Sequence, residues 1–378
     1  MNLSNYNLSL LKSEYWLLWF KKSHSFSVVD TNFKNVLDTY FTYNTSQDFL
    51  NYLVENGMDT SDAPGVLENI ENYLEDCMYS EDQASNIEVH LDKTARIETF
   101  YYRFRDFNFQ VNFNSSRVVP FFHKALAHLQ RLEKPKTIYA TFDIQIKNGL
   151  ISLFVNEDLI QSVPGTEYHK IQGKFNFCLQ NKIYNKSESD WIATLHGCSI
   201  AKNNNSILLI GHSGSGKSTA SALLAAHGYE VLADDISALA SDNLSIYNNP
   251  SAISLKSGSF ELVSQYFNTL GNIDSVQLNA NKGQLKFLPS PSTSKTHYPC
   301  KAIVLINYSA GAETNFSNVS LAEILEPLIP DSWISSEQEH VLKFMNWLDI
   351  QQFYKLTYSK TEEILKEIDA LFQSFENK

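Results

Sequence analysis

The stretch Ser206-Ile-Leu-Leu-Ile-Gly211-His-Ser-Gly-Ser-Gly216-Lys217-Ser218-Thr219 determines the fold that we expect for this chain. An apolar run typical of a buried strand leads into Gly-x-x-x-x-Gly-Lys-Ser, and residues 220–226 then have the composition of a helix. This order is that of a phosphate-binding P-loop, in which glycines let backbone N–H groups turn toward the phosphates. The helix N-terminus adds unpaired donors and a partial positive charge. The segment therefore predicts a nucleotide site; the alternative is a Gly/Ser surface loop before an Ala-rich helix.

Two side chains of this loop carry the charge and the metal chemistry. We expect Lys217 to contact the β- and γ-phosphates and the Ser218 hydroxyl to ligate Mg²⁺. His212 would contribute only its backbone. The expected cofactors are ATP and Mg²⁺, although the loop does not distinguish ATP from GTP. The expected nucleotide-binding residues are Gly211, Ser213, Gly214, Ser215, Gly216, Lys217, Ser218 and Thr219.

Two flanking segments identify the kind of P-loop. Leu-His-Gly precedes it, with His196 lying 21 residues before Lys217, and Ala-Asp-Asp follows it, with Asp235 lying 18 residues after Lys217. Together with Gly-x-Ser-Gly-x-Gly-Lys-Ser, these segments resemble the catalytic domain of HPr kinase/phosphorylase, which in turn resembles the nucleotide site of phosphoenolpyruvate carboxykinase. The resemblance covers roughly residues 190–370. It implies an α/β fold and a kinase.

The resemblance also assigns roles to individual residues. Asp235 would be the catalytic base and Asp234 the metal-side carboxylate, and adjacent residues of an extended strand face opposite ways, so the two acids cannot do the same job. His196 would contact the transferred phosphoryl group or orient Asp235. Lys256, in Ile-Ser-Leu-Lys-Ser-Gly-Ser, would stabilise developing charge. The alternatives are a plain metal ligand in an ATPase for Asp235, a structural role for His196 and a solvated position for Lys256.

One departure from the family limits what the resemblance implies. HPr kinases carry Glu-x-Arg-Gly-x-Gly after the Asp-Asp strand, and this chain has Asn-Pro-Ser-Ala-Ile-Ser-Leu-Lys-Ser-Gly over residues 249–258. In the family that signature supplies a second metal-binding carboxylate. We therefore expect a related kinase rather than a true HPr kinase.

The length of 378 residues predicts two or three domains. Residues 1–82 are expected to form a small α/β module, with a hairpin over residues 15–20 and 26–30. Helices would follow over residues 32–40, 46–56 and 62–79. This pattern is similar to the winged-helix peptide-recognition domain of the pyrroloquinoline-quinone peptide-chaperone group; the alternative is a stabilising or dimerisation module. The polar residues 80–85 mark the expected boundary.

Residues 83–190 are expected to form a β-rich region and residues 191–378 the catalytic domain. Alternating apolar and polar residues predict strands over residues 107–113, 139–146 and 150–155, and one amphipathic helix over residues 118–132. In the catalytic domain, the continuous apolar run 302–307 predicts a buried parallel strand. Further helices are expected over residues 259–267, 321–329, 337–347 and 361–372, with a strand over residues 353–358.

The composition of the chain limits the classes of binding partner that we expect. The net charge of −12 and the lack of a basic cluster argue against nucleic acid. The apolar residues 8–20 are interrupted by charges and too short to cross a bilayer, so no membrane partner is expected. Four widely separated cysteines predict reduced thiols and a cytoplasmic location. Homo-oligomer formation stays open.

The function expected from these features is an ATP-dependent kinase that transfers the γ-phosphoryl group to a hydroxyl. The resemblance favours a serine or threonine of a peptide or protein, with the precursor of a ribosomally made natural product as one candidate. The alternatives are a small-alcohol kinase, a P-loop ATPase acting as a nucleotide-dependent switch, and a nucleotide-sensing binding protein. The sequence contains no recognised arginine finger or sensor segment, and this favours the kinase.

Overall fold

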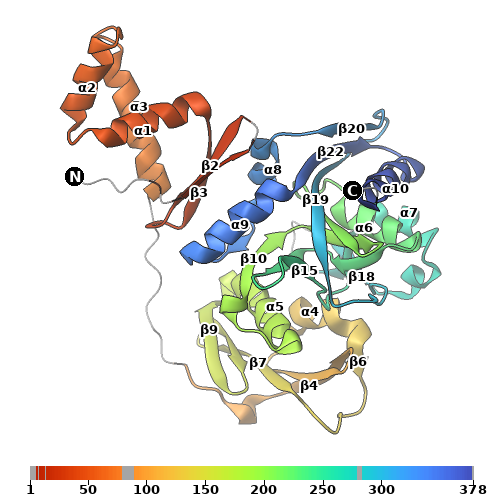
Figure 1. The fold of residues 1–378 in the computed structure, drawn as a ribbon. Coiled ribbons are helices and arrows are strands. Elements are labelled where there is room, and N and C mark those ends of the chain that lie inside the picture. Colours follow the sequence, from red (N-terminus) through yellow and green to blue (C-terminus); the bar gives the residue numbers. More distant parts are fainter. Residues whose placement is uncertain (1–5, 7, 13, 79–88, 279–282, 377–378) are drawn as a thin grey trace.

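The computed structural model describes residues 6, 8–12, 14–78, 89–278 and 283–376. Over these residues the protein is a mixed α/β structure with ten α-helices and several sheets (Figure 1). The polar boundary expected at residues 80–85 lies outside the described residues. In the described part of the chain, no helix combines the length and the apolar character that crossing a membrane requires. The four cysteines are free thiols.

The N-terminal unit is a three-stranded antiparallel sheet followed by three helices. The structure confirms the predicted hairpin and the three predicted helices, and adds an edge strand before them. Asp30 accepts a hydrogen bond from the backbone N–H of Phe33, and this N-cap starts the first helix. The elements are β1 (Leu8–Lys12), β2 (Tyr15–Phe20), β3 (Ser25–Asp30), α1 (Thr31–Thr42), α2 (Ser46–Glu55) and α3 (Ala63–Met78).

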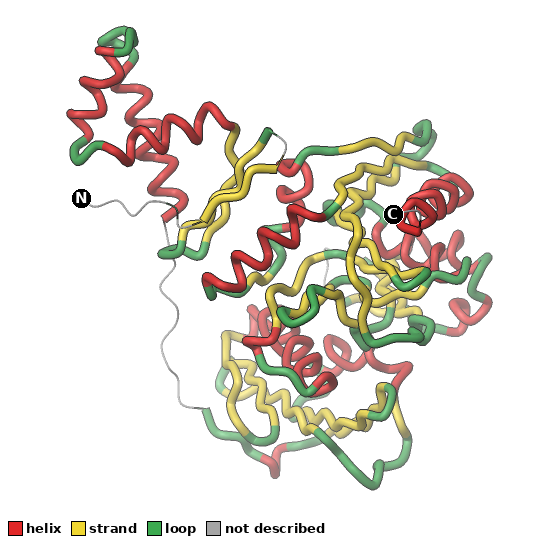
Figure 2. The backbone as a smooth tube through the Cα atoms, viewed as in Figure 1, coloured by secondary structure: helices red, strands yellow, loops and turns green. Residues whose placement is uncertain are grey.

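The two faces of this N-terminal sheet belong to different cores. Figure 2 shows its helices on one side and the rest of the molecule on the other. Leu18 and Phe20 are buried against the N-terminal helices. Leu17 and Trp19, which alternate with them, are fully buried in the core that contains Phe344 of helix α9 (Gln338–Ile350). The N-terminal unit therefore completes a hydrophobic core of the C-terminal unit, and this shared core favours a stabilising role for it.

The middle unit is a six-stranded sheet in the order β6-β4-β5-β7-β8-β9. Its apolar face packs against α4 and α5, and the buried side chains of α5 that face it recur at the helical spacing Ile171, Phe175 and Leu179. The strands are β4 (Glu98–Phe104), β5 (Phe107–Phe113), β6 (Gln130–Arg131), β7 (Ala140–Lys147), β8 (Leu150–Val155) and β9 (Asp158–Pro164), and the helices are α4 (Val119–His123) and α5 (Tyr168–Tyr184).

Two predictions for this region were wrong. The single helix expected over residues 118–132 is the short α4, a 3₁₀ helix over Lys124–Leu129 and strand β6. The chain leaves the helix because Gln130 pairs with Tyr102 on the edge of the sheet. The long helix α5 also lies where only strands were expected. Its apolar residues follow the helical period described above, and this period is the sequence signal for the helix.

The C-terminal unit is built on a ten-stranded sheet. The predicted strand 302–307 is confirmed within β19, which lies parallel to β12 on one side and β22 on the other. Helices α6 and α10 cover one face of the sheet, and α8 and α9 cover the other. The strands are β10 (Trp191–His196), β11 (Cys198–Lys202), β12 (Asn205–Ile210), β13 (Glu230–Ala233), β14 (Ile236–Ala240), β15 (Ser245–Tyr247), β19 (His297–Tyr308), β20 (Asn315–Asn318), β21 (Trp333–Ile334) and β22 (Gln352–Tyr358).

The remaining predicted elements of this unit are also found, with one adjustment. The helix expected over residues 259–267 is a 3₁₀ turn followed by the short α7. A small sheet, in the order β16-β18-β17, lies beside it. The elements are α6 (Lys217–Ala226), β16 (Ile253–Lys256), α7 (Phe260–Ser264), β17 (Val276–Gln277), β18 (Gln284–Leu288), α8 (Leu321–Leu328) and α10 (Thr361–Glu376).

Candidate functional site

The glycine-rich loop connects the end of β12 to the start of α6. Gly211 and Gly216 have φ angles of 147° and 96°. A Cβ at Gly211 would lie 2.6 Å from Ser215 Oγ and 2.8 Å from the carbonyl oxygen of Ile306, so no larger residue fits there. At Gly216 the positive φ disfavours any residue with a side chain. These constraints explain locally why the motif needs both glycines.

Lys217, the first residue of α6, lies back along the loop. Its Nζ donates hydrogen bonds to the carbonyl oxygens of Gly211, at 2.5 Å, and His212, at 3.3 Å. Because the N-cap of α6 is Gly216, no side chain of the N-cap residue accepts a hydrogen bond from the first turn of the helix. Residues 212–215 line a cavity of about 480 Å³ together with the end of β19. The loop thus borders the cavity next to the N-terminus of α6, an arrangement suited to an anion, while Glu323, Glu326 and Lys355 lie elsewhere on the lining.

Asp234 follows β13 and lies beneath the loop. Its Oδ2 accepts hydrogen bonds from Ser218 Oγ, at 3.1 Å, and from the backbone N–H of Ser254, at 2.8 Å. Only 5% of the residue is exposed. Burial raises the pKa of Asp234 to about 7, and the neighbouring charge of Asp235 acts in the same direction. The two residues expected to hold the metal, Ser218 and Asp234, are therefore in direct contact.

This donor set suits Mg²⁺. The described residues hold no cluster of three or more His, Cys, Asp or Glu side chains that would form a complete protein cage for a metal. Mg²⁺ does not need one, because it binds hard oxygen ligands and is commonly held by one or two protein groups with phosphate oxygens and waters completing its shell. The Asp234 carboxylate and the Ser218 hydroxyl are such groups.

Asp235 faces away from the buried carboxylate. Its side chain is 68% exposed, and its Oδ1 lies 3.5 Å from Nδ1 of His196, whose side chain is 25% exposed. The β10–β14 pairing positions the two, because His196 pairs with Ile236 and Gly197 donates to the carbonyl oxygen of Asp235 at 3.1 Å. A Cβ at Gly197 would lie 2.8 Å from the carbonyl oxygen of Leu209, which explains the glycine after the histidine.

Lys256 reaches the loop from the end of β16. Its Nζ donates to Ser213 Oγ at 3.1 Å, while Ser254 of the same strand donates to Asp234. The structure therefore brings Lys256 to the same site as Lys217, Asp234 and His196. Thr219 lies on α6, half-buried.

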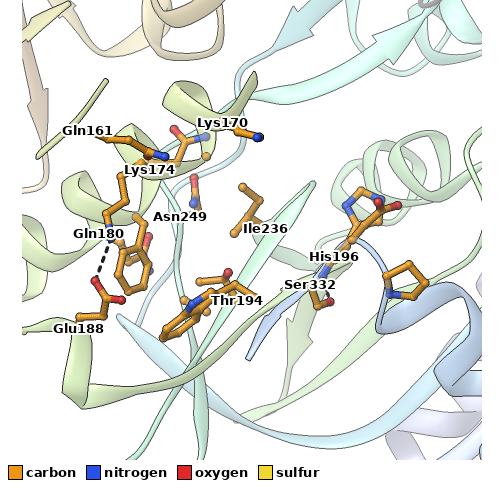
Figure 3. A pocket seen from close by; sticks show the side chains of 17 residues that line it. Gln161, Lys170, Lys174, Gln180, Glu188, Thr194, His196, Ile236, Asn249 and Ser332 are labelled. Atoms are coloured by element: carbon orange, nitrogen blue, oxygen red, sulfur yellow. Dashed lines mark hydrogen bonds and ion pairs between the residues drawn. The ribbon is translucent and has the colours of Figure 1, made fainter. Parts of the chain in front are cut away.

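A second cavity, of about 490 Å³, was not anticipated from the sequence. It extends from His196 along β10 and β14 to helix α5 of the middle unit. Figure 3 shows His196 and Ser332 at one side of it and Lys174, Gln180 and Glu188 at the opposite side, with Ile236 between. The helical spacing within α5 could have revealed the helix. Nothing local to α5 could have revealed that it borders the site, because that depends on how two separate units pack.

Comparison with known proteins adds no assignment: no family model matches the chain, and no curated protein sequence matches it.

Proposed function

We propose that this chain is an ATP-dependent kinase with an HPr kinase/phosphoenolpyruvate carboxykinase-like P-loop fold, and that it phosphorylates a serine or threonine of a peptide or protein. One observation carries the proposal. The two adjacent carboxylates are separated by environment, since Asp234 is buried against Ser218 and Asp235 is exposed beside His196, which lines a cavity. A hydrolytic switch needs a metal-side acid, but it does not need a second exposed acid paired with a histidine that lines a cavity of this size.

The loop side of the site would bind and position the donor. Backbone N–H groups of the loop and the N-terminus of α6 would hold the phosphates, and Lys217 would exchange its contacts with the loop carbonyls for phosphate oxygens. Ser218 and Asp234 would hold Mg²⁺, which neutralises phosphate charge when bound. Lys256 lies within reach of the loop through Ser213 and would stabilise charge that develops during transfer.

The cavity side would act on the acceptor. In the transfer, the acceptor oxygen bonds to the γ-phosphorus, the bond to the bridging oxygen breaks, and ADP leaves. Asp235 would accept the hydroxyl proton, because it is the exposed carboxylate at the junction of the loop and the cavity. His196 would hold the Asp235 carboxylate in place through the 3.5 Å contact.

The remaining parts of the proposal concern partners and location. A cytoplasmic enzyme acting on the precursor of a ribosomally made natural product is consistent with the sequence resemblance. The sheet of the N-terminal unit would stabilise the C-terminal unit, because it completes the core beside α9. Its helices, which face away from the rest of the molecule (Figure 2), would recognise the peptide.

The proposal is tested by comparing Asp235→Asn with Asp234→Asn in the full chain. Purified protein is given γ-labelled ATP, Mg²⁺ and a serine-containing peptide library, and both label transfer and ADP release are measured. Asp235→Asn should lower transfer by about 10²- to 10⁴-fold, the typical contribution of a general base, with unchanged binding of Mg·ATP. Asp234→Asn should mainly raise the Mg²⁺ concentration required.

Asp106→Asn, at a fully exposed carboxylate of the middle unit, is the matched control and should transfer normally. ADP release that does not depend on an acceptor and is unaffected by Asp235→Asn would identify an ATPase instead. Equal loss of nucleotide binding in both variants would remove the base assignment and leave only a metal role.

A further inference from the structure

The cavity beside His196 has a wall that comes from outside the P-loop unit. Helix α5 contributes Lys170, Lys174, Phe177 and Gln180, while β10, β14 and β21 contribute the opposite wall. Helix α5 is anchored in both units, because Phe175 packs in the middle core and Phe177 packs against Trp333. The cavity is therefore a fixed feature of the junction between the two units.

The part of the cavity away from His196 is aromatic. The ring centres of Phe177 and Trp333 lie 5.0 Å apart. Lys174 Nζ lies 5.3 Å from the centre of the Phe177 ring, so the aromatic pair lies beside Lys174. Trp333 is held by pairing with Thr194 of β10. An apolar side chain of a ligand would be buried there while a hydroxyl reaches the other end.

The formal charges on the lining are balanced, because it carries two lysines and the two carboxylates Glu188 and Asp331. Lys174 forms an ion pair with Glu188 at 2.9 Å, and Lys170 forms one with Glu167 at 2.6 Å. With both lysines paired, the lining does not offer the free cation that an anionic substrate would need. The ligand expected here is therefore uncharged where it crosses the cavity.

Amide side chains also line the cavity, and Gln161 and Gln180 lie on the same side as Lys174 (Figure 3). One of them, Gln180, is 2% exposed, and its Oε1 has no hydrogen-bond partner among the residues that the structure describes. Its Nε2 donates to the carbonyl oxygen of Asn248 at 3.4 Å. A buried acceptor without a donor is costly, so a ligand that brings a donor to the Gln180 oxygen would be bound more tightly. The amides on the lining are Gln161, Asn176, Gln180 and Asn249.

We infer that this cavity is the acceptor subsite and that it binds an uncharged peptide segment in which an apolar, preferably aromatic, residue is adjacent to the serine or threonine. The hydroxyl lies at His196 and Asp235, the apolar side chain packs against the contacting pair Phe177 and Trp333, and a backbone N–H donates to Gln180. A peptide fits because its backbone amides lie beside both a hydroxyl and an apolar side chain. The inference rests on the proposed kinase function and specifies its substrate class.

The test uses peptides Ac-Gly-Gly-X-Ser-X-Gly-Gly-amide in which X is Phe, Leu, Gly or Glu, with the full chain, Mg·ATP and a measure of kcat/KM. The Phe peptide should exceed the Gly peptide by about tenfold or more, as burial of one aromatic side chain allows. Trp333→Ala and Phe177→Ala should each lower the ratio of kcat/KM for the Phe peptide to kcat/KM for the Gly peptide to about one. Leu342→Ala, at an exposed apolar residue of α9, should keep the wild-type ratio.

A second readout separates the role of Gln180 from that of the aromatic pair. Gln180→Leu removes the unpaired acceptor and should raise KM for all four peptides alike, with unchanged kcat and unchanged Mg·ATP affinity. Normal Mg·ATP binding by each variant shows that it has folded. If Trp333→Ala does not fold, Phe177→Ala alone tests whether the preference for the Phe peptide depends on the aromatic pair.

Direct binding distinguishes failure of the inference from failure of the proposed function. A fluorescein-labelled Phe peptide is titrated with protein in the absence of ATP, and anisotropy is measured. Binding that Phe177→Ala abolishes, without phosphoryl transfer to any peptide, would refute the kinase and keep the peptide site. Transfer without preference for Phe, or the absence of both binding and transfer, would overturn the inference. A higher kcat/KM for free 3-phenylpropan-1-ol than for the Phe peptide would assign the cavity to a small alcohol instead.

Discussion

Asp234→Asn should make the ligand-free protein more stable at alkaline pH, although it removes a residue proposed to hold the metal. The Asp234 carboxylate is buried, and its donors, Ser218 Oγ and the backbone N–H of Ser254, are neutral. Without a compensating cation, burial raises the pKa of Asp234 from 3.8 to about 7. The folded protein therefore bears a cost whenever this group is ionised.

The sign and the size of the effect follow from proton linkage. Between pH 4 and pH 7 the folded protein holds a proton on Asp234 that the unfolded chain has released, so the free energy of unfolding falls as the pH rises through this window. Above pH 7 both states are ionised and the cost is constant. A shift of about three pH units at about 1.36 kcal/mol each amounts to about 4 kcal/mol. Because asparagine does not ionise, the variant does not bear the free-energy cost of a buried charge.

The assay is urea unfolding of the wild type and Asp234→Asn at pH 5 to 8.5 without Mg²⁺ or nucleotide. The stability of the variant relative to the wild type should increase by about 2.7 kcal/mol between pH 5 and pH 7, at about 1.36 kcal/mol for each pH unit, and level off above pH 7. Asp106→Asn, which removes an exposed carboxylate, should show no such trend. Mg·ATP should stabilise the wild type at pH 8 at a lower Mg²⁺ concentration than Asp234→Asn requires. A difference that is independent of pH would refute the reasoning.

Two further predictions concern the loop and the N-terminal sheet. Lys217→Ala should abolish binding of Mg·ATP, followed by calorimetry, and leave the circular dichroism spectrum native, because Lys217 contacts only loop carbonyls in the described structure; near-normal phosphoryl transfer would rule out the P-loop assignment. Trp19→Ala should lower the free energy of unfolding by about 3–5 kcal/mol and reduce the melting temperature of the Mg·ATP-bound state, because Trp19 lies in the core shared with α9. Leu18→Ala, on the opposite face of β2, should loosen only the N-terminal helices; equal effects of the two variants on the Mg·ATP-bound state would contradict a shared core.

Part of the candidate site follows from local sequence. The loop requires a positive φ at Gly211 and Gly216 and a helix that begins at Lys217, and both properties depend on residues close together in the chain. Asp234 and Asp235 lie in the bend between β13 and β14 rather than on the extended strand that the sequence predicted, and this bend separates their side chains. The resemblance predicted that Ser218 and Asp234 both hold the metal, and the structure shows them 3.1 Å apart.

The predictions from the sequence failed where contacts with distant residues overrode the structure that the local pattern favours. Residues 118–132 have an amphipathic pattern, yet pairing with Tyr102 draws Gln130 into the sheet. Trp19 belongs to an alternating strand whose two faces look alike in the sequence. Only the position of α9 shows that one of those faces completes a second core.

The sequence by itself determined the glycine-rich loop between β12 and α6, the flanking strands and the identity of the acidic pair, because backbone conformation and alternation depend on neighbouring residues. The tertiary structure alone determined that Lys256 contacts Ser213 and that α5 borders the cavity beside His196. It likewise brought Phe177 to Trp333. These contacts join segments from different units, and they form only because packing of the hydrophobic cores fixes how the units meet.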